Sequence, residues 1–148
     1  MAEMLSDPQP AAFLAEAARK PFVWGYNDCF LFAADWIVAC GHCDPAREWR
    51  GTYHNAFGAF RLLHRSGGAV ALARAAMAGF DEYDPATIEP RDGDVSMVEG
   101  GLEHRKGQPW WSNAAAVRVG RLWVVRTTTG LVGNCPPLLS PIVAWRLA

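Results

Sequence analysis

The most constraining feature of the sequence is an apolar run at residues 30–39, in which Asp35 is the only charged residue. A surface helix would carry polar residues along one side, whereas this run is apolar nearly all round. Asn27 or Asp28 can cap a helix here by accepting hydrogen bonds from the first backbone N–H groups, and Gly41 can end it. The run therefore predicts a core helix that is buried on most sides.

Cys29 falls in the first turn of this predicted helix, directly after a tight turn formed by Trp24-Gly25-Tyr26-Asn27. The backbone N–H groups and the dipole of a helix N-terminus favour an anion, so one interpretation is a nucleophilic thiolate. The other interpretation is a small buried hydrophobic residue, as is usual for cysteines outside disulfides. On position alone, the second interpretation is favoured.

The rest of the chain changes its hydrophobic period from helical to alternating near residue 93. Helices are predicted at residues 10–19, 55–65 and 69–78, and residues 84–92 read as a loop. Strands are predicted at residues 95–98, 114–119, 122–127, 131–132 and 142–147. We therefore expect an α+β fold in one domain, 1–148, with a helical part at about 9–80 and an antiparallel sheet at about 93–147.

Composition excludes several classes of protein. A hydrophobic content of 51% over 148 residues is typical of a globular chain, and a net charge of −1 does not favour nucleic-acid binding. No apolar run reaches the roughly 18 residues that a membrane span needs. Residues 1–20 lack the apolar core of a signal peptide, so we expect synthesis in the bacterial cytoplasm without a cleaved leader.

Several motifs resemble the NlpC-type cysteine peptidases, a papain-like superfamily. Trp24-Gly25 followed by Asp28-Cys29 resembles their nucleophile segment, and Gly93-Asp94-Val95 resembles the element that opens their first strand. A poorly characterised family related to these peptidases, found in phage and prophage tail gene clusters, offers a narrower resemblance. It rests on four segments: WGYNDC at 24–29, the turn containing Asp44-Pro45-Ala46, Arg50-Gly51-x-Tyr53, and Ala144-Trp145-Arg146.

The resemblance implies a papain-like domain whose central helix opens at Cys29 and packs on a small antiparallel sheet or half-barrel. It implies that Cys29 is the nucleophile of a peptidoglycan peptidase, with Trp24 and Asp28 beside the cleft and the oxyanion. It also implies a place in the virion tail, with tail proteins or cell-wall peptidoglycan as partners. No cofactor and no metal are expected.

The sequence departs from the peptidase pattern at the catalytic histidine. Such an enzyme needs an imidazole to take the thiol proton and to protonate the leaving amine. The resemblance places it near Ser112-Asn113-Ala114, where Asn113 cannot act as a base, and it places the orienting residue near Arg126-Thr127. His104, in the preceding loop, is the nearest histidine in the chain. Two hypotheses follow: a cysteine hydrolase with Cys29 as nucleophile and a base that the sequence does not identify, for which His104 is a candidate, or a tail component that has kept the fold and lost the chemistry.

A second cysteine motif, Cys40-Gly41-His42-Cys43, has the same sequence, CGHC, as the active site of disulfide isomerases. A redox dithiol needs its first cysteine at a helix N-terminus, whereas this pair follows the C-terminal end of a predicted helix, where the dipole opposes a thiolate. We therefore predict no redox function. Zinc binding by Cys40, His42, Cys43 and the distant Cys135 is a weak alternative, because a structural zinc site usually contains two close pairs.

Trp110 and Trp111 form an aromatic pair in a polar segment that contains glycine and proline. Exposed aromatic pairs serve as anchors in interfaces or as platforms on which sugars stack. Equally, the two rings can fold down over the core as part of a covering loop. The sequence leaves both interpretations open.

Overall fold

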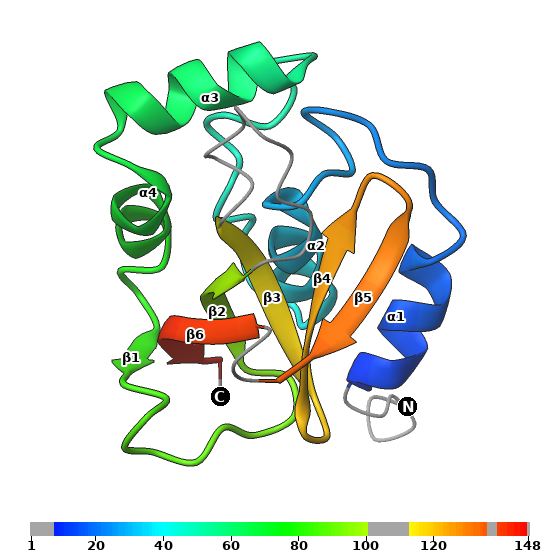
Figure 1. The fold of residues 1–148 in the computed structure, drawn as a ribbon, viewed down its shortest axis with the longest axis vertical. Coiled ribbons are helices and arrows are strands. Elements are labelled where there is room, and N and C mark those ends of the chain that lie inside the picture. Colours follow the sequence, from blue (N-terminus) through cyan, green and yellow to red (C-terminus); the bar gives the residue numbers. More distant parts are fainter. Residues whose placement is uncertain (1–7, 101–112, 136–138, 148) are drawn as a thin grey trace.

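The computed structural model describes residues 8–100, 113–135 and 139–147, and within these ranges helices come first and strands follow (Figure 1). The helices are α1 (Pro10–Ala17), α2 (Leu31–Ala39), α3 (Ala56–Arg65) and α4 (Ala69–Ala76). The strands are β1 (Asp81–Tyr83), β2 (Val95–Gly100), β3 (Asn113–Val119), β4 (Leu122–Thr127), β5 (Gly130–Asn134) and β6 (Leu139–Arg146).

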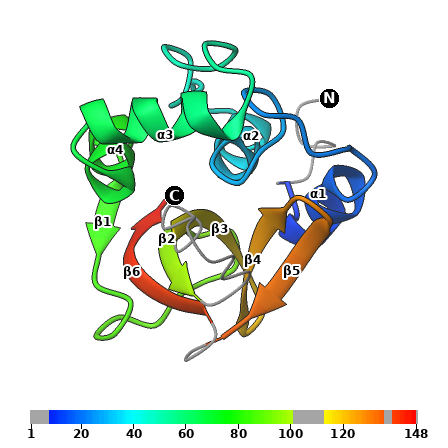
Figure 2. The same ribbon diagram turned by 45° about the horizontal axis from the view of Figure 1, so that its top comes forward.

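The strands form one six-stranded sheet in the order β1-β6-β2-β3-β4-β5, and every neighbouring pair is antiparallel. The sheet is open and strongly curved, and the helices lie along one side of it (Figure 2). The predicted α+β class with an antiparallel sheet is therefore confirmed.

Helix α2 is the centre of the core, as its apolar sequence predicted. Six of its nine residues are buried, and Phe32, Ala33, Trp36 and Ile37 pack with side chains from β2 and β3. The indole N–H of Trp36 is satisfied by a 2.8 Å hydrogen bond to the carbonyl oxygen of Gly93.

A bilayer span needs about 20 apolar residues in a helix. Among the residues that the structure describes, no helix reaches the length and apolar character of a membrane span.

Strands β3 and β4 separate partway along their length, and the chain leading into α2 lies at this opening. Their paired residues extend only from Val119 to Val117 on β3. Further along β3, the backbone N–H of Ala115 donates to the carbonyl oxygen of Cys29 at 3.1 Å. Cys29 is thus fixed to the sheet through its backbone. It lies where β4 would lie if the pairing of β4 with β3 continued.

The sequence missed two features of the sheet. The short strand β1 was not predicted, and it pairs with the end of β6, more than sixty residues away in the chain. The last strand was predicted at residues 142–147, after Pro141. In the structure β6 begins at Leu139, and Pro141 sits opposite Val98 at a shift of register that follows Met97. The irregularity accommodates the proline within the strand.

Candidate functional site

Cys29 lies in the turn that leads directly into α2. The assigned helix begins at Leu31, but its hydrogen bonds begin earlier, because the backbone N–H of Phe32 donates to the Asp28 carbonyl at 3.2 Å. Helix boundaries routinely differ by one or two residues between definitions. By its hydrogen bonds, Cys29 therefore occupies the first turn, as expected.

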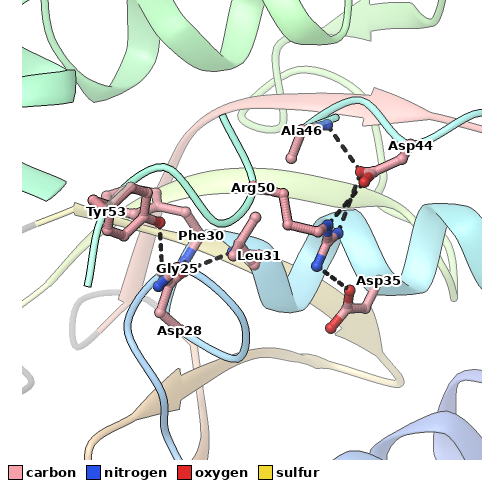
Figure 3. Close-up of polar contacts among 9 residues, drawn as sticks. All are labelled: Gly25, Asp28, Phe30, Leu31, Asp35, Asp44, Ala46, Arg50 and Tyr53. Atoms are coloured by element: carbon pink, nitrogen blue, oxygen red, sulfur yellow. Dashed lines mark hydrogen bonds and ion pairs between the residues drawn. The ribbon is translucent and has the colours of Figure 1, made fainter. Parts of the chain in front are cut away.

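The Asp28 side chain caps this turn and is fully buried. Its carboxylate accepts from the backbone N–H groups of Phe30 at 3.0 Å and Leu31 at 2.9 Å, which confirms the predicted cap. It also accepts from the N–H of Gly25 at 3.0 Å and from the hydroxyl of Tyr53 at 2.5 Å (Figure 3). Burial and the neighbouring Asp28 charge raise the pKa of the Tyr53 hydroxyl, so Tyr53 remains a proton donor in this bond.

Gly25 is packed so closely that no other residue fits. It has a φ of +84°, and a Cβ atom there would lie 2.1 Å from the carbonyl oxygen of Tyr53. Its own carbonyl accepts from the N–H of Gly51 at 2.9 Å. The Trp-Gly turn is thus joined by backbone contacts to the segment that carries Tyr53.

Arg50 joins the same segment to α2 by bridging two carboxylates. It forms an ion pair with Asp35 at 2.9 Å and donates twice to Asp44, at 2.8 and 3.2 Å (Figure 3). Burial favours protonation of Asp44, but hydrogen bonds from Arg50 and from the N–H of Ala46 hold its pKa below the usual range. Burial dominates at Asp35, whose pKa is raised despite the contact with Arg50.

Two further motifs of the resemblance meet at Asp94. This buried carboxylate is paired with Arg146 at 3.0 Å and accepts from the Tyr83 hydroxyl at 2.5 Å and the N–H of Arg91 at 3.0 Å. The Gly-Asp-Val and Ala-Trp-Arg segments are therefore joined across β2 and β6. In this structure these motif residues hold the fold together.

The thiol of Cys29 has very different surroundings. It is 9% exposed and belongs to an apolar cluster on the sheet. The buried members of that cluster are Val98, Ala114, Ala116, Trp123, Val125, Leu139 and Ala144. Burial raises the pKa of the Cys29 thiol far above its ordinary value, and the negative charge of Asp28 raises it further. The helix N-terminus does not overcome these two effects, so the thiol is protonated at neutral pH.

No histidine of the described ranges is paired with Cys29. Each of the three lies against an aromatic ring elsewhere, in the pairs His42–Phe80, His54–Tyr26 and His64–Phe60. His104, the candidate base, lies outside the residues that the structure describes. Its role stays a prediction.

Asn113 begins β3 and faces the helices. Side chains alternate along a strand, so Asn113 shares a face with Ala115, which packs with α2, whereas Ala114 packs with Cys29. Asn113 lines a surface hollow of about 480 Å³ together with His64. Of the three positions near which the resemblance places the catalytic histidine, Asn113 is turned away from the cluster that contains the thiol, Ala114 packs in that cluster and has no imidazole, and Ser112 lies outside the described residues.

The resemblance places the orienting residue near Arg126-Thr127, and in the structure Arg126 has a structural role. The guanidinium of Arg126 is buried and lies over the ring of Phe32. It donates to the carbonyl oxygens of Lys20, at 3.0 Å, and of Ala17, which satisfies backbone groups at the end of α1. Arg126 thus ties α1 to β4 and, as a cation, cannot orient an imidazolium.

The remaining predicted positions are placed as follows. Trp24 packs edge-on against Phe22, with ring centroids 4.8 Å apart, and borders the cluster of Cys29. Trp110 and Trp111 lie outside the described residues. Cys40 caps the C-terminal end of α2, and Cys43 is exposed. Within the described ranges, no three His, Cys, Asp or Glu side chains are grouped as metal ligands, which leaves the zinc alternative without a site there.

Sequence reasoning missed the roles of Arg50 and Tyr53. No helix or strand is predicted for the segment that contains them, although both residues belong to a motif of the resemblance. An arginine among partly buried acidic residues, and a tyrosine near a capping aspartate, are signals of a polar network. The partners could not be assigned because Tyr53 and Asp28 are 25 positions apart in the chain.

The profile of one protein family, a domain of unknown function (DUF6950), matches residues 4–147, so the chain belongs to this family. No curated protein and no solved structure matches the chain. Because the description of the family names no activity, the function has to be inferred from the residues around Cys29.

Proposed function

We propose that this member of the DUF6950 family is a relative of the NlpC-type cysteine hydrolases that has lost the catalytic step and acts as a non-catalytic component of a phage or prophage tail. Two features support the relationship: Asp28-Cys29 opens the central helix, and Gly93-Asp94-Val95 leads into the strand β2. An antiparallel sheet after the helices agrees with the expected order of elements.

The burial of the Cys29 thiol is the observation that carries the loss of activity. Amide cleavage by a cysteine requires transfer of the thiol proton to a base, attack of the sulfur on the carbonyl carbon, and protonation of the departing amine. The raised pKa of Cys29 opposes the first step. Within the described ranges no imidazole is placed to take that proton or to return it to the amine.

An active peptidase is the second candidate, and the topology of the sheet favours it in one respect. Residues 101–112, which include His104, connect β2 to β3, and β3 is bonded to Cys29 through Ala115. In this second function His104 takes the thiol proton, a thioester forms as the amine leaves, and water then hydrolyses the thioester on a peptidoglycan peptide.

Release of muropeptides from purified peptidoglycan tests the two candidates. We expect no release above background from the wild-type chain, and no difference between it and Cys29→Ala. Release that disappears in both Cys29→Ala and His104→Ala, but persists in His42→Ala, would establish the peptidase and overturn the proposal. His42 is a suitable control because it follows the C-terminal end of α2 and its ring lies against Phe80, whereas Cys29 precedes the N-terminal end of the helix.

Alkylation of the thiols gives a second, independent readout. Cys29 should react with iodoacetamide at pH 8 at least about 100-fold more slowly than the exposed Cys43 and Cys135, because both burial and a raised pKa reduce the reactive thiolate. Peptide mass spectrometry follows each site separately. Modification of Cys29 as fast as that of Cys43 would show an accessible, activated thiol.

The place in a tail rests on the resemblance alone and has its own test. In a phage or prophage that encodes this chain, mass spectrometry should detect the protein in purified particles. A Cys29→Ala allele should yield particles as infectious as the wild type, whereas deletion of the whole coding sequence should abolish tail assembly. Absence of the protein from purified particles would contradict the assignment.

A further inference from the structure

The outward face of α3 is the most unusual surface of the described residues. Ala59, Leu62 and Leu63 bury the inner side of this helix against the rest of the fold. The opposite side carries Phe57, Phe60, Arg61 and His64, whose spacing of three and four residues places them along one stripe. Phe57 is 67% exposed, the highest value among the large apolar side chains that the structure describes.

This stripe, which we call the α3 face, is cationic as well as aromatic. Helix α3 contains no acidic residue, and Arg61 and Arg65 are both exposed. The guanidinium of Arg61 lies 5.7 Å from the centroid of the Phe57 ring, and the ring of His64 is stacked on Phe60 at 6.3 Å. A contiguous exposed aromatic surface with charges of one sign is typical of an interface with an acidic partner.

A surface of complementary chemistry is present on the same molecule, at residues 81–92. This segment carries five carboxylates and one guanidinium, a net charge of −4, and Ile88 within it is 46% exposed. Figure 1 shows the segment between β1 and β2 at the bottom of the molecule, at the opposite end of the long axis from α3. The two surfaces therefore cannot meet within one molecule.

We propose that the α3 face binds residues 81–92 of a second copy of this chain. In this contact Phe57 packs on Ile88, and Arg61 and Arg65 lie among the carboxylates of the partner. Because the two surfaces differ and lie at opposite ends, the contact is head-to-tail and leaves an unused surface at each end. Copies then add until a ring closes, or they continue as a filament. The inference rests on the surface chemistry and is independent of the state of Cys29.

Sedimentation velocity of the full chain, over a range of concentrations, tests the proposal. We expect the mean mass to rise above that of the 16.2 kDa monomer with concentration. The association should weaken as NaCl is raised from about 0.01 M to about 1 M, which shortens the Debye length from about 30 Å to about 3 Å. A monomer at every concentration in low salt would overturn the proposal and would leave the α3 face to a foreign acidic partner.

Charge reversal identifies the two surfaces. Arg61→Glu and Glu89→Lys should each weaken self-association by at least about tenfold, because each places like charges in contact. Arg121→Glu, an exposed reversal in the turn between β3 and β4, is the matched control and should leave association unchanged. Phe57→Ala tests the apolar part of the contact and should weaken association without changing net charge.

A mixture of the two reversal variants is the most discriminating sample. In a sample of either variant alone, every contact between copies joins the reversed surface to a native surface of the same charge. In the mixture, the carboxylate introduced by Arg61→Glu in one chain meets the ammonium introduced by Glu89→Lys in the other, and the second contact is native. We expect the mixture to recover association that neither variant shows alone.

Failure of the mixture to recover, with both variants folded by circular dichroism, would show that these surfaces do not bind each other. Muropeptide release and thiol alkylation should be identical in all of these variants, so the two proposals fail separately.

Discussion

Asp28 and Cys29 are neighbours in the chain, yet their side chains have opposite kinds of surroundings. The Asp28 carboxylate is buried with four donors around it, whereas the Cys29 thiol lies in an apolar cluster, where a hydrogen bond from its own backbone favours the thiolate but is outweighed by burial. A charged group can be buried only where hydrogen bonds replace its water, and a catalytic thiol needs a base and an exposed approach. The difference supports the proposal that the residues around Asp28 and Cys29 stabilise the fold and do not catalyse a reaction.

Removal of the Asp28 carboxylate should have the largest effect on stability. Asp28→Ala should lower the free energy of unfolding by about 3–5 kcal/mol, because it leaves three backbone N–H groups and the Tyr53 hydroxyl without their acceptor. Urea unfolding followed by fluorescence measures it. Tyr53→Phe should cost about 1.5–3 kcal/mol, and the double variant should cost little more than Asp28→Ala alone. A loss below about 1 kcal/mol in Asp28→Ala would mean that the network contributes little.

Disturbing the close backbone packing at Gly25 should have the next largest effect on stability. Gly25→Ala should cost about 2–4 kcal/mol, because its Cβ would overlap the carbonyl oxygen of Tyr53. Gly41→Ala is a matched control, since Gly41 has a similar φ of +92° but no atom within 4 Å of the added Cβ. It should cost only about 1–2 kcal/mol, the conformational part of the penalty. Equal losses in the two variants would show that the approach of Tyr53 is relaxed easily.

Substitutions of Cys29 should reduce stability less than the substitutions of Asp28 and Gly25 do. Cys29→Ala removes one buried sulfur atom and no hydrogen bond to a side chain, so we expect a loss of about 1 kcal/mol or less. The same urea titration measures it. Cys29→Ser provides the sharper contrast, because a hydroxyl is more costly than a thiol to bury in this apolar cluster and should cost more than alanine does. Should serine prove as stable as cysteine, a polar group must lie near the thiol.

The smallest effect concerns Asp35 and Asp44, the two carboxylates that are paired with Arg50. It appears only when the pH is changed. The folded-state pKa of Asp44 is lowered, so its stabilisation is present above its unfolded pKa of about 3.9 and is lost as pH falls through the folded value. The raised pKa of Asp35 has the opposite sign, and its contribution decreases as pH rises above about 3.9. Both groups are partly exposed, so each effect should stay below about 1 kcal/mol.

Comparison of Asp44→Asn with Asp35→Asn at pH 3 and pH 7 measures these slopes. Asp44→Asn should flatten the loss of stability in acid, and Asp35→Asn should steepen it. Changes of slope relative to the wild type that have the same sign in the two variants would contradict the assigned directions.

Helices and strands could be predicted well because their signals are local. The apolar residues of α2, the cap at Asp28 and the stop at Gly41 lie within one short segment, and the positive φ of Gly41 confirms the stop. The turn at Gly120-Arg121 likewise joins β3 and β4 as expected. The strand β1 has only three residues and depends on its pairing with β6, so its own sequence carried little signal.

The candidate site was harder to predict, because competing effects decide it at long range. The helix N-terminus correctly located Cys29, and the favoured interpretation of a small buried residue agrees with the structure, but the sequence could not give the cluster on the sheet that surrounds the thiol. Contacts of Cys29 with β3 and β4 join residues that are more than eighty positions apart. Burial in this cluster is the main cause of the raised pKa of the thiol, and the charge of Asp28 is the second.

The position of β6 within the sheet has a consequence for how the chain can fold during synthesis. The last strand of the described residues lies between β1 and β2, so both sides of its backbone are hydrogen-bonded to segments made much earlier. Until residues 139–146 leave the ribosome, β1 has no partner strand and β2 keeps one open edge. Completion of the sheet is therefore a late, long-range event, and a nascent chain that ends before Leu139 exposes strand edges that can pair with other chains.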